Sequence, residues 1–102
     1  MSIQKSTNPK KKYMVTVNYN NKTKTIHFGA SGYKDYIQYY KEDGKEEADK
    51  KKTAYIARHK LNEDFNNPLT SGFWSLRILW NLQTLNASLK DTLNKVSNIK
   101  LE

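Results

Sequence analysis

An alternating stretch near the N-terminus, YMVTVNYNNKTKTIHF, places the strongest constraint on the fold. Apolar and polar side chains alternate on both sides of Asn20 and Asn21, so each half has one apolar face, as in a strand that packs on one side. Asparagine tolerates the left-handed backbone that a tight hairpin turn requires. The pattern predicts a β-hairpin with strands at 13–19 and 23–28, whose apolar faces carry Val15, Val17, Tyr19, Ile26 and Phe28.

Four segments after the hairpin have helical spacing or helix-capping residues. A short helix is expected to end near Gly44, because glycine readily adopts the backbone found after a helix C-terminus. A second helix, at about 46–62, has acids near its start and bases near its end, which suits the helix dipole. Thr70 or Ser71 is expected to cap the third helix, and Thr84 the fourth.

The third helix, expected at 72–81, is the most informative segment. Its residues FWSLRILW leave almost no polar face, so the rest of the protein should surround it. Phe73, Trp74 and Trp80, together with Tyr55, are therefore predicted to be core residues. A chain of 102 residues offers little material to cover such a helix. Part of it is therefore expected to be buried by a second copy in a two-fold homodimer.

These elements predict an α+β fold, in which an N-terminal β-hairpin packs on three to four short helices in a single small domain. The domain is expected to span 13–97. Residues 1–12 are polar, contain Pro9 and lack periodicity, so they are predicted to form a flexible basic tail. Residues 98–102 are predicted to be a frayed C-terminus, although the two apolar side chains in this segment would be able to dock.

The junction FGASGYKDYIQYYK contains two features that each admit two interpretations. Gly29 and Gly32 resemble a phosphate-binding loop, but such loops lead directly into a helix and this pair follows a strand. A chain reversal that needs positive φ is the favoured interpretation. Four tyrosines between 33 and 40 are interleaved with lysines, which suits stacking on nucleic-acid bases. Packing in an amphipathic core is favoured for them, because such rings more often serve that purpose.

The composition is strongly basic. Eighteen Lys and Arg stand against ten Asp and Glu, which gives a net charge of +8 and favours polyanionic partners such as nucleic acid or an acidic protein surface. Hydrophobic residues make up only 36%, so the core must be thin. The sequence contains no cysteine, which excludes a disulfide framework and a thiolate zinc site. No apolar run is long enough to span a membrane, so no membrane partner is expected.

The sequence lacks the residue patterns of known catalytic and metal-binding motifs. His27 and His59 lie on different predicted elements, and neither belongs to a spaced set of ligands. There is no phosphate-binding motif in which glycines precede a lysine, and no Gly-x-Ser-x-Gly. We therefore expect no enzymatic activity, no metal and no cofactor.

Three segments, FGASGYKDYIQYYK, YIARHKLNEDFNNPLTSGFWSLRILWN and TLNASLKDT, resemble a family of short, basic, uncharacterised proteins of large nucleocytoplasmic DNA viruses, in the chlorovirus-, mimivirus- and marseillevirus-like groups. The resemblance covers roughly residues 13–93 and depends mainly on the spacing of R-H-K, G-F-W-S and L-W-N. It implies a viral protein that acts in the virion or in a cytoplasmic virus factory. It implies no catalytic residues. Separately from the resemblance, Lys10, Lys11 and Lys12 match a minimal nuclear import signal, which leaves the nucleus open as a location, although a solvated arm is the favoured interpretation of these lysines.

Charge and resemblance together leave two hypotheses for the function. The first is a non-catalytic viral nucleic-acid-binding protein that contacts DNA mainly through phosphates, without sequence specificity. The second is a minor structural virion protein that mediates protein–protein contacts, with its basic tail meeting acidic partners. The residues predicted to bind nucleic acid are Lys10, Lys11, Lys12, Lys34, Arg58, His59 and Lys60.

Overall fold

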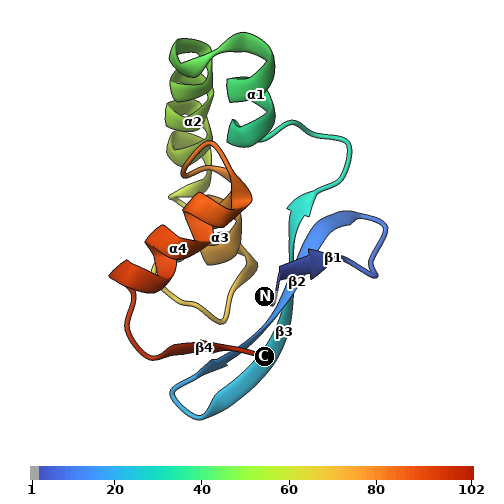
Figure 1. The fold of residues 1–102 in the computed structure, drawn as a ribbon, viewed down its shortest axis with the longest axis vertical. Coiled ribbons are helices and arrows are strands. Elements are labelled where there is room, and N and C mark those ends of the chain that lie inside the picture. The colour runs from blue at the N-terminus through green and yellow to red at the C-terminus, as the bar shows by residue number, and fades with distance from the viewer. Residues whose placement is uncertain (1–2) are drawn as a thin grey trace.

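The structure is a computed structural model that describes residues 3–102 (Figure 1). An antiparallel sheet packs with helices in one domain, which confirms the α+β fold. In chain order the elements are β1 (Ile3–Lys5), β2 (Lys11–Tyr19), β3 (Lys22–Ala30), α1 (Tyr36–Asp43), α2 (Lys45–His59), α3 (Ser71–Trp74), the π-helical turn η1 (Ser75–Leu79), α4 (Leu85–Lys95) and β4 (Ile99–Leu101).

The predicted hairpin is the centre of the sheet. β2 and β3 pair along their whole length, and both strands extend beyond the predicted bounds. Asn20 and Asn21 connect them with φ of 50° and 66°. Positive φ at both central residues is the mark of a type I′ turn, whose twist matches that of the flanking strands. The Asn-Asn signal in the sequence is therefore confirmed.

The flexible tail predicted for residues 1–12 is wrong from residue 3 onward, and residues 1 and 2 lie outside the described part of the chain. β1 pairs with the first half of β2, with Ile3 opposite Val15, and the Ile3 side chain is buried. The chain then turns through Asn8, whose side-chain Oδ1 accepts a hydrogen bond from the Lys10 N–H at 3.0 Å. Asn-Pro here forms a turn between two strands. A three-residue strand is too short to show periodicity in the sequence.

The frayed C-terminus predicted for residues 98–102 is also wrong. β4 pairs with the second half of β2, on the edge that β1 also uses, and places Leu101 opposite Val17. Asn98, with φ of 66°, provides the left-handed residue that turns the chain from α4 into this strand. Half-buried Ile99 and Leu101 pack against the core. The two chain ends therefore complete the sheet (Figure 1).

Two of the helices begin at the capping residues that the sequence indicated. Thr70 caps α3 and Thr84 caps α4, each with a hydroxyl that accepts a hydrogen bond from a backbone N–H in the first turn. Gly44, with φ of 88°, separates α1 from α2, so the short first helix ends where it was predicted to end. α1 and α2 lie side by side at one end of the molecule's long axis (Figure 1).

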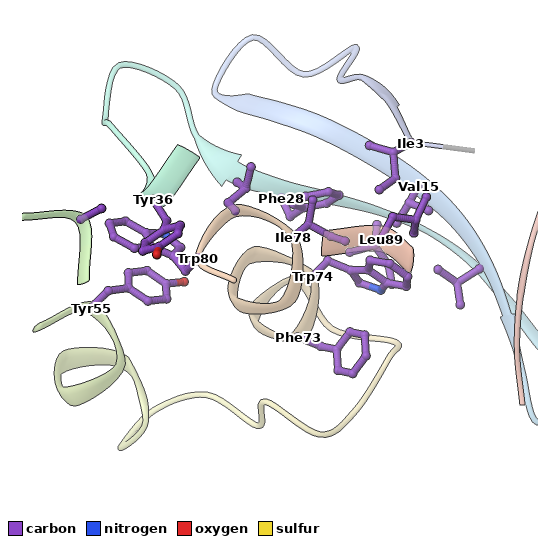
Figure 2. Packing of buried hydrophobic residues seen from close by; sticks show 14 residues of the cluster. Ile3, Val15, Phe28, Tyr36, Tyr55, Phe73, Trp74, Ile78, Trp80 and Leu89 are labelled. Carbon is purple, nitrogen blue, oxygen red and sulfur yellow. The ribbon is translucent and has the colours of Figure 1, made fainter. Parts of the chain in front are cut away.

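The third helix runs as α3 and then as η1, and its own chain covers it. Phe73, Trp74 and Ile78 have no exposed surface, and Trp80 is 9% exposed. Phe28 of β3 packs on Trp74 with ring centroids 6.3 Å apart, and Figure 2 shows these side chains between the strands and the helix. The premise that a second copy is needed to cover this helix is wrong. The homodimer stays a prediction without that support.

Candidate functional site

A groove of about 500 Å³ lies where five parts of the chain meet: the start of β2, the end of β3, the loop into α1, the second half of α2, and the α3–η1 helix. Its lining combines basic and aromatic side chains with two carboxylates. The lining residues that matter for its chemistry are Lys11, Lys12, Tyr33, Lys34, Asp35, Tyr39, Lys51, Tyr55, Arg58, His59, Glu63 and Trp80.

Five of the seven residues predicted to bind nucleic acid line this groove: Lys11, Lys12, Lys34, Arg58 and His59. They come from β2, from the loop before α1 and from the last turn of α2, so the fold brings together positions that are as much as 48 residues apart in the sequence.

The other two predicted residues, Lys10 and Lys60, are exposed and do not line the groove. Sequence reasoning missed Lys51, which does line it. Lys51, Tyr55 and Arg58 are spaced at i, i+4 and i+7 on α2, which places them on one helix face. That spacing was the available signal.

The positive charges of the groove are only partly neutralised. Lys12 Nζ lies 2.8 Å from Asp35 Oδ2 and also donates a hydrogen bond to Gln38 Oε1 at 3.1 Å. Lys34 forms a half-exposed ion pair with Glu42 at 2.9 Å. Among residues 3–102, neither Lys11 nor Arg58 forms an ion pair. Among the described residues, the groove therefore presents two cations without an ion-pair partner, Lys11 and Arg58, beside the largely buried Lys12–Asp35 pair and the half-exposed Lys34–Glu42 pair, which water screens.

Three stacked rings form one wall of the groove. Tyr55 lies between His59 and Trp80, with ring centroids 4.3 Å and 4.5 Å away, and its plane is within 9° of the Trp80 plane. Burial, with a contribution from the nearby Glu63 charge, raises the pKa of Tyr55 to about 12. Tyr55 therefore stays neutral and acts as a rigid spacer that holds His59 at the surface of the groove.

Glu63 supplies a carboxylate next to His59. The two residues are four apart, and Glu63 Oε1 lies 3.5 Å from His59 Nδ1. The second oxygen, Oε2, is buried and has no hydrogen-bond partner among the described residues. It lies against α3 at Gly72, where a Cβ atom would be 3.1 Å from it. The i, i+4 spacing of this pair is visible in the sequence, but it was not among the features from which we predicted the site.

The loop between β3 and α1 forms the rim of the groove. Gly29 and Gly32 have φ of 80° and 86°, so both adopt the positive φ expected for a chain reversal. The N-terminus of α1 is closed by its own side chains: Asp35 accepts a hydrogen bond from the Gln38 N–H at 3.1 Å, and Gln38 Oε1 accepts one from the Asp35 N–H. A carboxylate thus occupies the place that a phosphate would take. The turn interpretation is confirmed.

Two further features of the described residues bear on the site. Within residues 3–102, no group of three His, Asp or Glu side chains is arranged to hold a metal ion. Over the same residues, every helix is too short or too polar to cross a membrane.

Comparison with known proteins gives one match. The sequence model of a protein family matches residues 1–59, and that family is described as a family of unknown function (DUF5754). No curated protein and no solved structure matches the chain significantly. The matched segment runs from β1 to the end of α2, so it contains all five predicted residues that line the groove.

Proposed function

With a match over more than half of its length, the chain belongs to the DUF5754 family of unknown function, and we propose that it is a non-catalytic nucleic-acid-binding protein. One observation carries the proposal: basic residues from three separate elements, predicted independently of the structure, line one groove. Nucleic-acid phosphates are the ligands that such a set of side chains suits best.

The groove contributes to binding through charge. Each phosphate that a Lys or Arg neutralises releases condensed counterions, so affinity comes mainly from electrostatics and falls steeply with salt. Arg58 is the strongest candidate for a direct phosphate contact, because its planar guanidinium donates two parallel hydrogen bonds and no carboxylate occupies it among residues 3–102. Lys11, which likewise forms no ion pair among residues 3–102, adds a second cation. The net charge of +8 steers a polyanion toward the protein from a distance.

The setting of this activity is proposed from the sequence resemblance alone. The three segments that resemble proteins of large nucleocytoplasmic DNA viruses support a role in the virion or in the viral replication compartment. The family description names neither a source nor an activity.

The test is a titration of a mixed-sequence oligonucleotide, single-stranded and duplex, over a series of salt concentrations. Neutralising several phosphates should give a log–log plot of affinity against salt with a slope of about −0.7 to −0.9 per phosphate contacted. Lys11→Gln and Arg58→Gln should each lower the affinity and reduce the slope by about one contact.

Lys10→Gln and Lys60→Gln are the matched controls, because each removes the same charge from an exposed position outside the groove. These controls should change the affinity less than the groove variants do. Absence of binding to either oligonucleotide at low salt would refute the proposal. Equal losses for all four variants would show that the charge acts diffusely and that the groove is not the site.

A further inference from the structure

We propose that the groove takes a single-stranded nucleic acid, with one base stacked on the ring of Tyr33 at its rim. This inference rests on the proposed function and names the class of nucleic acid that the site prefers. Two observations support it: the structure leaves only one tyrosine of the 33–40 cluster unused by the fold, and that tyrosine lies among the groove cations.

The fold uses three of the four clustered tyrosines. Tyr36 is buried and its hydroxyl donates a hydrogen bond to Asp49 at 2.7 Å. Tyr40 packs on Tyr36, with ring centroids 5.8 Å apart, and Tyr39 packs on Trp80 at 6.2 Å. Tyr33 is different, because 74% of it is exposed. The stacking interpretation of this cluster therefore applies to Tyr33 alone.

The position of Tyr33 suits a base. It follows Gly32, precedes Lys34 and lines the groove together with Lys11 and Arg58. Its backbone N–H donates to the Ala30 carbonyl at 3.4 Å, which anchors the loop. The exposed Tyr33 side chain leaves its ring accessible to a ligand. A basic track with an exposed aromatic side chain is the arrangement by which proteins bind single strands without sequence preference.

A duplex cannot use this arrangement. Its bases are stacked inside the helix, so it offers only phosphates and base edges to the protein. An unpaired base presents its face, and every base has a face that an aromatic ring can cover. Cations alone would bind both forms, but Tyr33 adds affinity only for the single strand.

The experiment compares Tyr33→Ala with the parent protein on three probes: a mixed-sequence single strand, the matching duplex, and inorganic polyphosphate. Tyr33→Ala should weaken single-strand binding about tenfold, within the range measured for base–aromatic stacking, and should leave polyphosphate and duplex affinities unchanged. Tyr33→Trp should retain single-strand affinity because the larger ring still stacks. Circular dichroism melting verifies that each variant folds.

Leu61→Ala is the control, because Leu61 is 83% exposed and does not line the groove. It should have no effect on any probe. If the parent binds all three probes and Tyr33→Ala binds them equally well, the stacking inference is refuted while the proposed function stands. If the parent binds none of the three, the proposed function itself fails. A loss of polyphosphate binding in folded Tyr33→Ala would also overturn the inference, since polyphosphate has no base to stack.

Discussion

Replacing Gly29 with alanine should destabilise the fold more than the same change at Gly32, although both glycines have nearly the same φ. Their φ values are 80° and 86°, so a Cβ atom introduces backbone strain of about 1–2 kcal/mol at each position. At Gly32 no atom lies within 4 Å of the added Cβ. At Gly29 the added Cβ would be 2.5 Å from Leu79 Cδ1 and 3.3 Å from Lys12 Cβ.

The contact with Leu79 determines how much stability Gly29→Ala loses. Leu79 is 2% exposed on η1, so it cannot move away without disturbing the core, and overpacking of this kind costs about 1–3 kcal/mol. Gly29→Ala should therefore cost about 2–5 kcal/mol and Gly32→Ala about 1–2 kcal/mol. For a domain of this size each kcal/mol lowers the Tm by roughly 4–8 °C, so thermal melting resolves the two variants.

A double-mutant cycle with Leu79→Ala isolates the contact. Removing the Leu79 side chain should relieve the clash, so Gly29→Ala should cost about 1–3 kcal/mol less in the Leu79→Ala background than in the parent. Gly32→Ala should cost the same in both backgrounds. Equal melting temperatures for Gly29→Ala and Gly32→Ala, or additive effects of Gly29→Ala and Leu79→Ala, would refute the close approach of β3 to η1.

Three further perturbations test other parts of the fold. Trp80→Ala should cost about 3–5 kcal/mol in denaturant unfolding, a typical loss for a large buried ring, and an unchanged midpoint would place Trp80 outside the core. Ile3→Ala should cost about 2 kcal/mol, the low end for an isoleucine truncation because β1 is a short edge strand, whereas a free N-terminal arm would give no change. In an alkaline titration followed by tyrosine absorbance, Tyr36 and Tyr55 should ionise near pH 12, since burial raises the pKa of each to about 12. Both pKa values exceed the unfolded value of about 10, so the free energy of unfolding that these two groups contribute is fully present below pH 10 and is lost as the pH rises toward 12. Titration of all tyrosines near pH 10 would contradict the burial of Tyr36 and Tyr55.

Local signals in the sequence predicted most of the fold. Period-two alternation around Asn20 and Asn21 fixed the hairpin, because its register depends on the turn and on one apolar face. Thr70 and Thr84 identified two helix starts, because their hydroxyls satisfy backbone donors within the same turn. Each of these signals acts over a few residues, so a single sequence is enough to reveal it.

Elements that are stabilised by segments far away in the sequence could not be predicted from local sequence patterns. β1 contributes one buried side chain, Ile3, and its strand conformation is stabilised by pairing with β2. β4 likewise depends on β2, at the far end of the chain. The π turn in η1 lies in a run whose composition suits an α-helix equally well, and propensity does not separate the two. Short edge strands and helix irregularities are determined by tertiary contacts.

The candidate site shows the same division. Charge and residue type selected Lys11 and Arg58, which the fold places in one groove, but the selection also included Lys60, which does not line it. Lys51 was missed because lysines around a helix are usually solvated, and only the position of α2 against η1 determines which of its faces is enclosed. Composition thus identifies the charged residues, and the tertiary fold determines which of them share one groove.

The outer edge of β3 is the remaining structural reason to expect a homodimer. In a hairpin with a two-residue turn, the residues that flank the turn, here Tyr19 and Lys22, exchange hydrogen bonds with each other. Hydrogen-bonded and non-hydrogen-bonded residue pairs alternate along an antiparallel ladder. The backbone N–H and C=O groups of Thr23, Thr25 and His27 therefore point away from β2. Gly29 follows in the same series, and its N–H does leave the sheet, donating to Ser75 Oγ at 3.3 Å.

We predict that this edge pairs with the same edge of a second copy, and that Thr25→Pro abolishes the pairing. Proline lacks an N–H, and at Thr25 that N–H faces outward, so the ladder to β2 is retained. Lys22 and Lys24 of the two chains would approach one another, so dimerisation should strengthen as salt rises, whereas nucleic-acid binding weakens. Light scattering at micromolar concentration should give twice the chain mass of 11.9 kDa for the parent and the chain mass for Thr25→Pro. A parent mass of 11.9 kDa at every concentration and salt would end the dimer proposal, and would identify Lys22 and Lys24 as charges that keep an exposed edge strand from pairing.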